Sequence, residues 1–306
     1  MNHLLFWVLF NIFVAGMLAL DLGVFHRRSE ALTLRQALTW SAVWVALAWA
    51  FAMLLWITQG RTAALEFSTG YVIELSLSID NLFIFLLIFR YFHLAGHEQY
   101  RVLFWGIIGA IVTRAAFIFA GVGLIGKFHW IIYAFGLLLV FTGLRLLFRG
   151  RAQMDPEKNV ALRLFRRVVP VADGPAEGKL FVRRERLYAT PLLLVLLVVE
   201  STDVLFAVDS IPAVLAITLN TFIVYTSNIF AILGLRSLFF ALSSLMDIFK
   251  YLHYGISCIL IFVGFKMLAS HYYEIGTEIS LAVISGILLA AIVASVLWGR
   301  ENTGVA

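Results

Sequence analysis

The feature that most constrains this chain is an apolar run, long enough to cross a bilayer, that acidic side chains interrupt. The run extends from Leu192 to Ile217 and contains Glu200, Asp203 and Asp209. A helix needs about 20 apolar residues to cross a hydrocarbon core of roughly 30 Å. A charged side chain at that depth is costly, so it usually faces a cavity or a partner and marks a transport path. The run therefore predicts a membrane helix with a polar, functional face.

A second apolar run, earlier in the chain, carries the same pattern. In both runs an acid is followed six positions later by an aspartate and then by a small polar side chain. Positions six apart on a helix point about 120° away from each other, so the two acids of a run should face different neighbours. The matching sets are Glu74, Asp80 and Asn81 in the first run and Asp203, Asp209 and Ser210 in the second.

The composition extends this interpretation to the whole chain. It is 62% hydrophobic and 13% charged, with a mean hydropathy of +0.96, whereas soluble domains average about 25% charged residues. Apolar runs of this length indicate helices and not barrel strands. We expect an all-α polytopic membrane protein whose nine transmembrane helices contain two inverted three-helix repeats. The nine spans are Leu4 to Val24, Leu38 to Thr58, Thr69 to Phe89, Val102 to Leu124, Trp130 to Phe148, Pro191 to Ile217, Phe222 to Ser244, Tyr251 to Ala269 and Ile279 to Trp298.

The expected inverted repeat rests on matches in three consecutive spans. Beyond the acidic runs, Arg114 in span four matches Arg236 in span seven, and Gly143 in span five matches Gly264 in span eight. Because each unit has an odd number of spans, the second unit enters the membrane from the opposite side. Transporters of this type commonly bind substrate near the midplane, at the interface of the repeats. The chain then forms one transporter domain, 1–306, with repeat one at 69–148, a linker at 149–190 and repeat two at 191–270.

Basic residues set the expected orientation. Loops after the odd-numbered spans hold most of the arginines, whereas loops after the even-numbered spans hold only Arg61, Lys127 and Lys266. By the positive-inside rule the N-terminus lies outside, and the C-terminus and the 149–190 loop lie in the cytoplasm. The net charge of +5 therefore reports orientation and not a nucleic-acid partner. The single cysteine, Cys258, cannot form an internal disulfide.

The buried charges favour a cationic substrate. Five acids in the spans total −5 if all are ionised, and two arginines supply +2, which leaves −3. The side chains of these runs offer only oxygen ligands, which suit Mn²⁺, Ca²⁺ and Mg²⁺ better than Cu⁺ or Zn²⁺. Pro212 predicts an unwound segment around 209–210, whose carbonyl groups could act as further ligands. The acids are Glu74, Asp80, Glu200, Asp203 and Asp209, and the arginines are Arg114 and Arg236.

Each of these residues also has a structural interpretation. The acids could form salt bridges with the arginines and hold the bundle together, and the arginines could serve only as charge compensation. Asn228 is a candidate gate or accessory residue, or it forms a hydrogen bond between helices. Asp21 is a candidate for the same accessory role, or it is an interfacial side chain that reaches headgroup water.

At the two acidic runs the sequence resembles the TerC family of membrane proteins, which is related to the lysine-exporter superfamily. The resemblance rests on the stretch from Glu200 to Pro212, Glu-Ser-Thr-Asp-Val-Leu-Phe-Ala-Val-Asp-Ser-Ile-Pro, and on residues 74–81. It looks most like the Alx-type members, nine-span proteins of the bacterial inner membrane. The resemblance implies manganese export from the cytoplasm. On the matching positions it implies a metal path through Glu74, Asp80, Asn81, Glu200, Asp203, Asp209 and Ser210.

The residues and the resemblance together suggest a secondary transporter that exports a divalent metal ion, above all Mn²⁺, by alternating access. Asp80 and Asp209 are the expected central ligands, near the midplane. Protons are the candidate counter-ion, since a buried carboxylate can hold a proton when no metal is bound. We expect Mn²⁺ as a transported substrate, no tightly bound cofactor, and the lipid bilayer as the other partner.

The alternative is a membrane assembly or scaffold protein of the tellurite-resistance type, with a structural polar core and partners on the 149–190 loop. An enzyme is not expected, because the chain has no His-Glu-x-x-His motif and no nucleophile beside a base. The selectivity among Mn²⁺, Ca²⁺ and Mg²⁺ and the oligomeric state stay open at this point.

Overall fold

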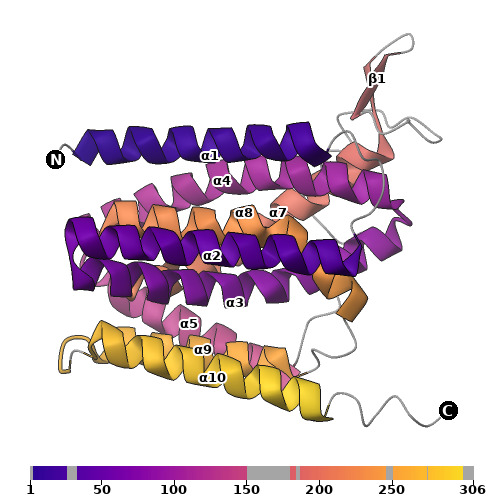
Figure 1. Ribbon diagram of the computed structural model, residues 1–306. Helices are drawn as coiled ribbons and strands as arrows, with labels where there is room; N and C mark the ends of the chain where they lie inside the picture. The colour runs from indigo at the N-terminus through magenta and orange to yellow at the C-terminus, as the bar shows by residue number, and fades with distance from the viewer. Residues whose placement is uncertain are drawn as a thin grey trace.

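The protein is a bundle of long helices that lie side by side, as seen in the computed structural model (Figure 1). The structure describes residues 3–25, 33–149, 180–183, 187–245, 251–273 and 275–298. The helices are α1 (His3–Phe25), α2 (Leu34–Gln59), α3 (Arg61–Tyr91), α4 (Gly96–Lys127), α5 (Ile131–Arg149), α7 (Pro191–Leu215), α8 (Thr221–Leu245), α9 (Leu252–Ala269) and α10 (Thr277–Trp298).

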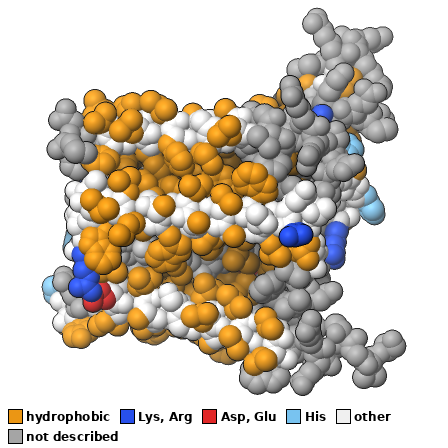
Figure 2. Space-filling model, viewed as in Figure 1, with side chains coloured by type: hydrophobic (Ala, Val, Ile, Leu, Met, Phe, Trp, Pro, Cys, Tyr) orange, Lys and Arg blue, Asp and Glu red, His pale blue; other side chains and the backbone are white. Residues whose placement is uncertain are grey.

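Eight of the nine expected spans coincide with helices that are long and apolar enough to cross a membrane. Among the residues described, these helices are α2 to α5 and α7 to α10. The first expected span also forms a helix, α1, but the apolar stretch described there, Leu4–Leu20, is too short to count as a full span. On the face shown in Figure 2, apolar side chains cover the middle and charged ones gather toward the two ends. This distribution fits a protein surrounded by lipid.

The all-α expectation is confirmed for the bundle, with one exception in the 149–190 linker. Strands β1 (Phe181–Arg183) and β2 (Leu187–Ala189) pair antiparallel there, with Val182 opposite Tyr188. They form a short hairpin that projects beyond the helices (Figure 1). The other linker residues, 150–179 and 184–186, lie outside the described residues.

Local sequence signals place several helix ends. Thr33 begins α2 with a capping box, in which its hydroxyl accepts a hydrogen bond from the Gln36 N–H and its own N–H donates to the Gln36 side chain. Gly60 alone joins α2 to α3, and its φ of 94° is readily adopted only by glycine. Thr190 caps α7, and Pro191 occupies the first turn. A backbone N–H in the first turn has no partner within the helix, so proline loses no hydrogen bond there.

Helix α7 is continuous through its acidic stretch, so the expected unwound segment around 209–210 is wrong. Pro212 lies inside the helix, one turn before the end at Leu215. Proline removes one backbone hydrogen bond, but its φ suits a helix. The following turn continues, because the Ala216 N–H donates to the Pro212 carbonyl at 3.0 Å. The backbone at 209–210 is therefore not released as a set of ligands.

Helices α3 and α8 form the centre of the bundle, and α3 packs against α2, α7 and α8. Helix α4 packs against α7 and α8, and α5 packs along α9. The α5–α9 contact is close, because a Cβ at Gly264 would lie 2.8 Å from the Gly136 carbonyl oxygen. Helix α1 contacts α8 mainly through aromatic rings, and the ring centres of Phe10 and Phe230 lie 5.8 Å apart. The Tyr225 hydroxyl of α8 also donates a hydrogen bond of 2.9 Å to Asn11.

Candidate functional site

A buried cluster of charged side chains lies at the centre of the bundle, where α3, α4 and α7 meet. Arg114 of α4 is fully buried. Its Nη1 donates to Oε1 of Glu74 on α3, and its Nη2 donates to Oδ1 of Asp203 on α7 at 3.3 Å. Glu74 is 0% exposed and Asp203 is 5% exposed. Arg114 therefore lies where it can compensate the charge of both acids, and this role stays a prediction.

The cluster lies near the middle of the membrane-spanning helices. Each of its three charged residues is at least 12 residues from either end of its helix, which corresponds to about 18 Å at 1.5 Å per residue. Water cannot reach the charges from either face without a path through the bundle. These charges are therefore stabilised by the ion pair and its hydrogen bonds and not by water.

Neutral oxygens complete the surroundings of the Arg114 guanidinium. Its Nη1 also donates to Oδ1 of Asn228 on α8 at 3.2 Å and to Oγ of Ser210 on α7 at 3.5 Å. Asn228 is oriented by its own amide, which donates to the Val224 carbonyl at 3.0 Å. Asn228 thus links α8 to Arg114 of α4 at the charged centre, and both the hydrogen-bond and the accessory interpretations of this residue are compatible with its position.

The cluster carries more negative than positive charge, and three of its polar atoms have no hydrogen-bond partner. One arginine faces two acids, so the net charge is −1 if all three are ionised. Among the described residues, the buried side-chain atoms without a partner are Glu74 Oε2, Asp203 Oδ2 and Arg114 Nε. Buried polar atoms without partners are rare in native proteins and call for an explanation, of which a bound ion is one. The two carboxylate oxygens without partners are therefore candidate ligands for a cation.

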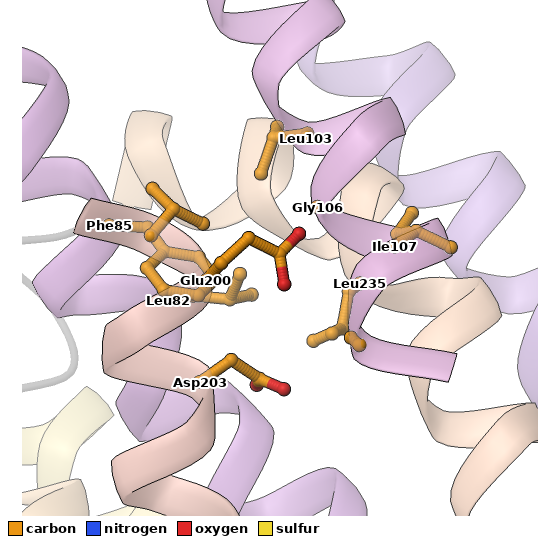
Figure 3. Close-up of a pocket in the computed structure, with 10 residues that line it drawn as sticks. Leu82, Phe85, Leu103, Gly106, Ile107, Glu200, Asp203 and Leu235 are labelled. Atoms are coloured by element: carbon orange, nitrogen blue, oxygen red, sulfur yellow. The ribbon is translucent and has the colours of Figure 1, made fainter. Parts of the chain in front are cut away.

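Glu200 lies one turn from Asp203 on α7 and borders a small cavity (Figure 3). The cavity has a volume of about 20 Å³, which is enough for one water molecule. The Glu200 carboxylate points toward α4, near Gly106 and Ile107 (Figure 3). A Cβ at Gly109 would overlap this carboxylate, so glycine at that position makes room for it. Glu200 also lies within electrostatic reach of Asp203.

Asp209 faces a different partner from Asp203, as their separation of six residues predicts. Its Oδ1 accepts a hydrogen bond of 3.0 Å from the hydroxyl of Thr142 on α5. Asp209 also lies within electrostatic reach of Arg145, which belongs to α5 like Thr142. Asp209 is half-buried and belongs to the α5–α7 contact, not to the central cluster.

The structure does not bring Asp80 and Asp209 together at the midplane, and their expected role as central ligands stays a prediction. Helices α3 and α7 run in opposite directions, with the start of α3 beside the end of α7, where Glu66 lies against Thr218. Asp80 and Asp209 therefore lie on opposite sides of the central cluster, each about 9 Å from it along its helix. Asp80 is half-buried, and its neighbour Asn81 is buried.

The described contacts of the second buried arginine, Arg236, do not include the carboxylates of Glu74 and Asp203. Arg236 of α8 donates to the hydroxyl of Tyr100 at 2.9 Å, and its guanidinium lies 4.5 Å from the centre of the Tyr100 ring. A cation over an aromatic face is stabilised by the ring quadrupole. Asp21 belongs to α1, but its side chain lies outside the described residues.

A larger cavity opens at the end of the bundle where α7 and α9 end and α10 begins. Its volume is about 400 Å³, and Lys266 and Thr218 are among the residues that line it. The Lys266 Nζ donates to Oγ of Ser280 at 3.0 Å. Glu66 lies beside Thr218 and within electrostatic reach of Lys266. This end of the bundle also holds the start of α1, the terminus that the positive-inside rule predicts to be outside.

The described residues contain no group of three acidic, histidine or cysteine side chains placed to hold a metal ion together. The structure instead brings together two acids, Glu74 and Asp203, with two neutral oxygens on Ser210 and Asn228. Oxygen atoms from carboxylate, amide and hydroxyl groups are the ligands that hard divalent cations prefer. The donor set therefore fits a hard divalent cation in type, while the guanidinium of Arg114 lies among these oxygens.

Sequence reasoning missed several residues that the structure places beside the acids. Thr142 interrupts the apolar side of span five next to Gly143, and this isolated hydroxyl was a detectable signal. Gly109 makes room for Glu200, but no sequence pattern distinguishes it from other helical glycines. Glu66 was missed because it precedes Thr69, the expected start of span three. Helix α3 begins eight residues earlier, at Arg61.

The chain matches known proteins over almost its whole length. The model of the integral membrane protein TerC family matches residues 59–303. A membrane protein of Myxococcus xanthus, STKORF319, which is uncharacterized, is 48% identical over 296 residues, covering 96% of this chain and 93% of that protein. The Alx protein of Escherichia coli (strain K12), described provisionally as a membrane-bound redox modulator, is 45% identical over 295 residues, covering 93% of this chain and 92% of that protein.

An uncharacterized membrane protein of Rickettsia bellii is 39% identical over 297 residues, covering 97% of this chain and 98% of that protein. No solved structure matches the chain significantly. The matches run through the helices that carry the central cluster, and they agree with the resemblance found at the acidic runs. The chain therefore belongs to the TerC family of integral membrane proteins.

Proposed function

We propose that this protein is a secondary transporter that exports a divalent metal ion, above all Mn²⁺, from the cytoplasm of a bacterium across the inner membrane. The observation that carries the proposal is the buried cluster of Glu74, Arg114 and Asp203, which has an excess of negative charge and two carboxylate oxygens without partners. A buried ion pair that served only stability would be balanced in charge and saturated with hydrogen bonds.

The ligand types support a hard cation as the cargo. The oxygens around the centre come from two carboxylates, the Ser210 hydroxyl and the Asn228 amide. Glu200, one turn away, adds a further negative charge beside a water-sized cavity. Glu74, Asp203, Glu200 and Arg114 together carry a net charge of −2 if all are ionised, which matches one divalent cation. We propose Mn²⁺ as cargo and no enzymatic activity.

Alternating access requires two units that can rock against each other, and we propose the inverted repeat for this role. Reciprocal contacts between α5 and α9 support it. A Cβ at Gly143 would lie 2.9 Å from the Ser257 carbonyl oxygen, and one at Gly264 would lie 2.8 Å from the Gly136 carbonyl oxygen. The offset of 121 residues that relates Gly143 to Gly264 also relates Gly136 to Ser257. Such a pair of contacts is what a pseudo-twofold axis between the units would produce.

The path of the ion then runs from Glu200 through the central cluster to the far side. Glu200 lies toward the end of the bundle that carries the basic loops, and we place the cytoplasm there. Asp209 with Thr142 lies on the opposite side of the centre, and the cavity of about 400 Å³ at the end of α7 would be the exit. Asp80 lies toward the cytoplasmic side by the same axial reasoning.

The test is Mn²⁺ efflux from liposomes that contain the purified protein. We expect Glu74→Gln and Asp203→Asn to reduce efflux at least tenfold, while Glu278→Gln, which neutralises an exposed acid paired with Arg61, retains wild-type efflux. Ca²⁺ and Mg²⁺ added with Mn²⁺ would then rank the ions. Absence of efflux of any divalent ion by folded wild-type protein would overturn the proposal and favour the scaffold alternative.

The scaffold alternative makes the opposite prediction about the same chain. If the 149–190 loop holds partners and the acids only build a polar core, deletion of that loop should abolish the cellular phenotype while Asp203→Asn leaves it intact. The transporter proposal expects Asp203→Asn to abolish metal tolerance. Growth of a strain without the native gene in excess Mn²⁺, complemented with each variant, separates the two.

The provisional description of the Alx relatives suggests modulation of redox state as a related role. Cys258 is the single cysteine of the sequence and is exposed on α9, so thiol–disulfide exchange within one chain is not open to it. Export of a redox-active metal would affect the redox state of a cell without any thiol chemistry in this protein. We therefore propose that a redox effect, where one is measured, follows from metal transport.

A further inference from the structure

The guanidinium of Arg114 lies among oxygens that would themselves suit a divalent cation. Four oxygens from three helices surround it: Oε1 of Glu74, and at distances of 3.3, 3.2 and 3.5 Å the side-chain oxygens of Asp203, Asn228 and Ser210. Two anionic and two neutral oxygens are a normal part of the coordination of a hard divalent ion. The positive group of the protein and the proposed cargo therefore require the same atoms.

Both cations cannot use these oxygens at once. Like charges a few ångströms apart repel strongly in a buried site, where water does not screen them. The guanidinium also fills the space between the two carboxylates, because it contacts both of them directly. Entry of a divalent ion thus requires the guanidinium to withdraw from at least one of the two acids.

We propose that Arg114 is a tethered competitor of the transported ion, which neutralises the acid pair while no metal is bound and displaces the metal when it returns. The inference rests on the proposed transport of a divalent cation. It assigns to Arg114 a part in the transport cycle, beyond static charge compensation. It also gives a role to the one oxygen of each acid that lacks a partner in this conformation, because that oxygen would bind the metal ion.

The packing around the cluster connects the movement of Arg114 to a movement of helices. The cavity between α4 and α7, lined by Ala110, Glu200 and Asp203 among others, has only about 20 Å³. A guanidinium group is larger than the single water molecule that this volume accommodates. Withdrawal of Arg114 therefore requires α4 and α7 to separate or slide. Binding of the metal would in this way favour a second conformation, as a transporter needs for alternating access.

The experiment compares Mn²⁺ affinity and Mn²⁺ efflux in wild-type protein, Arg114→Gln and Arg114→Lys. Affinity is measured on protein in detergent by the loss of the electron paramagnetic resonance signal of free Mn²⁺. Arg61→Gln is the matched control, because Arg61 is an arginine at the start of α3 whose pair with Glu278 is exposed. Efflux is measured in liposomes with the same preparations.

Loss of a competing charge should raise Mn²⁺ affinity on the order of tenfold or more in Arg114→Gln. Arg114→Lys keeps the charge but cannot reach all four oxygens, so we expect a smaller increase. Efflux at saturating Mn²⁺ should fall in both variants, because nothing displaces the metal effectively. Arg61→Gln should match the wild type in both assays. Tighter binding together with slower efflux is a combination that a purely structural arginine would not produce.

Two results would overturn the inference, and they differ in what else they overturn. Wild-type binding and efflux together with equal or weaker Mn²⁺ binding in the Arg114 variants would refute the competitor role and leave the transporter proposal in place. A folded wild-type protein that neither binds nor transports a divalent ion would refute both. If Arg114→Gln does not fold, Arg114→Lys decides, because a structural role predicts weaker Mn²⁺ binding and the competitor role predicts tighter binding.

Discussion

The charge balance of the central cluster predicts an unequal response of its three members to neutralisation. In the wild-type protein one guanidinium faces two buried carboxylates. Asp203→Asn leaves Arg114 and Glu74 as a neutral pair, and the asparagine Oδ1 can still accept the hydrogen bond, so we expect a loss of about 1 kcal/mol in the free energy of unfolding. Arg114→Gln leaves two carboxylates without a counter-charge, and we expect a loss of about 3–5 kcal/mol.

The double variant provides the decisive comparison. Arg114→Gln with Asp203→Asn contains one buried carboxylate, Glu74, and again has a net charge of −1. Because the two changes act on the same contact, they should not add, and we expect the double variant to be more stable than the sum of the single effects by roughly 0.5–3 kcal/mol. If Mn²⁺ occupies the vacated place, Mn²⁺ at about 100 times its dissociation constant should restore about 2.7 kcal/mol to Arg114→Gln.

The assay is thermal unfolding of detergent-solubilised protein, followed by the fluorescence of its eight tryptophans, with and without Mn²⁺. Arg61→Gln serves as the control, since the side chains of Arg61 and Glu278 are 65% and 59% exposed and exposed pairs contribute about 0–1 kcal/mol. The reasoning is refuted if Arg114→Gln is as stable as Asp203→Asn. It is equally refuted if the two effects add, because the charges would then not interact as the structure indicates.

Three further predictions concern the path and the packing around it. Gly109→Ala should reduce Mn²⁺ efflux by displacing the Glu200 carboxylate, whereas Gly106→Ala on the same face of α4 should be tolerated, because its Cβ would lie 3.6 Å from the nearest atom; equal efflux in the two variants would contradict the assigned position of Glu200. Gly264→Ala should lower the unfolding temperature, at a cost of about 1–3 kcal/mol, because the added methyl group meets the backbone of α5, whereas Gly286→Ala, with nothing within 4 Å, should not. Efflux should respond to an imposed pH gradient while ionophores clamp the membrane potential, and a rate that ignores the gradient would exclude proton exchange.

Several features of the molecule follow directly from residue types and their spacing. Apolar runs of span length predict membrane helices, because the thickness of the hydrocarbon core sets the length and lipid offers no hydrogen bonds to the backbone. The same argument singles out acids within those runs, since the cost of a charge in lipid depends little on the rest of the fold. The prediction that acids six positions apart face different neighbours also held, because helix periodicity is local.

The tertiary structure alone decided which acids meet. Glu74 and Asp203 converge on Arg114 because α3 and α7 run in opposite directions and cross at these positions, whereas Asp80 and Asp209 lie on either side of the crossing. Helix phase and crossing depend on contacts between residues far apart in the chain, and sequence periodicity does not contain them.

The continuity of α7 was likewise a tertiary outcome. A proline near the end of a helix removes one hydrogen bond, and whether the helix breaks there depends on the packing of its last turn, in which Ile211 to Leu215 are all buried. Residue types thus determined that this protein has a charged interior within the membrane. The packing of distant helices determined where those charges meet, because convergence in space is a property of the assembled bundle and not of any one segment.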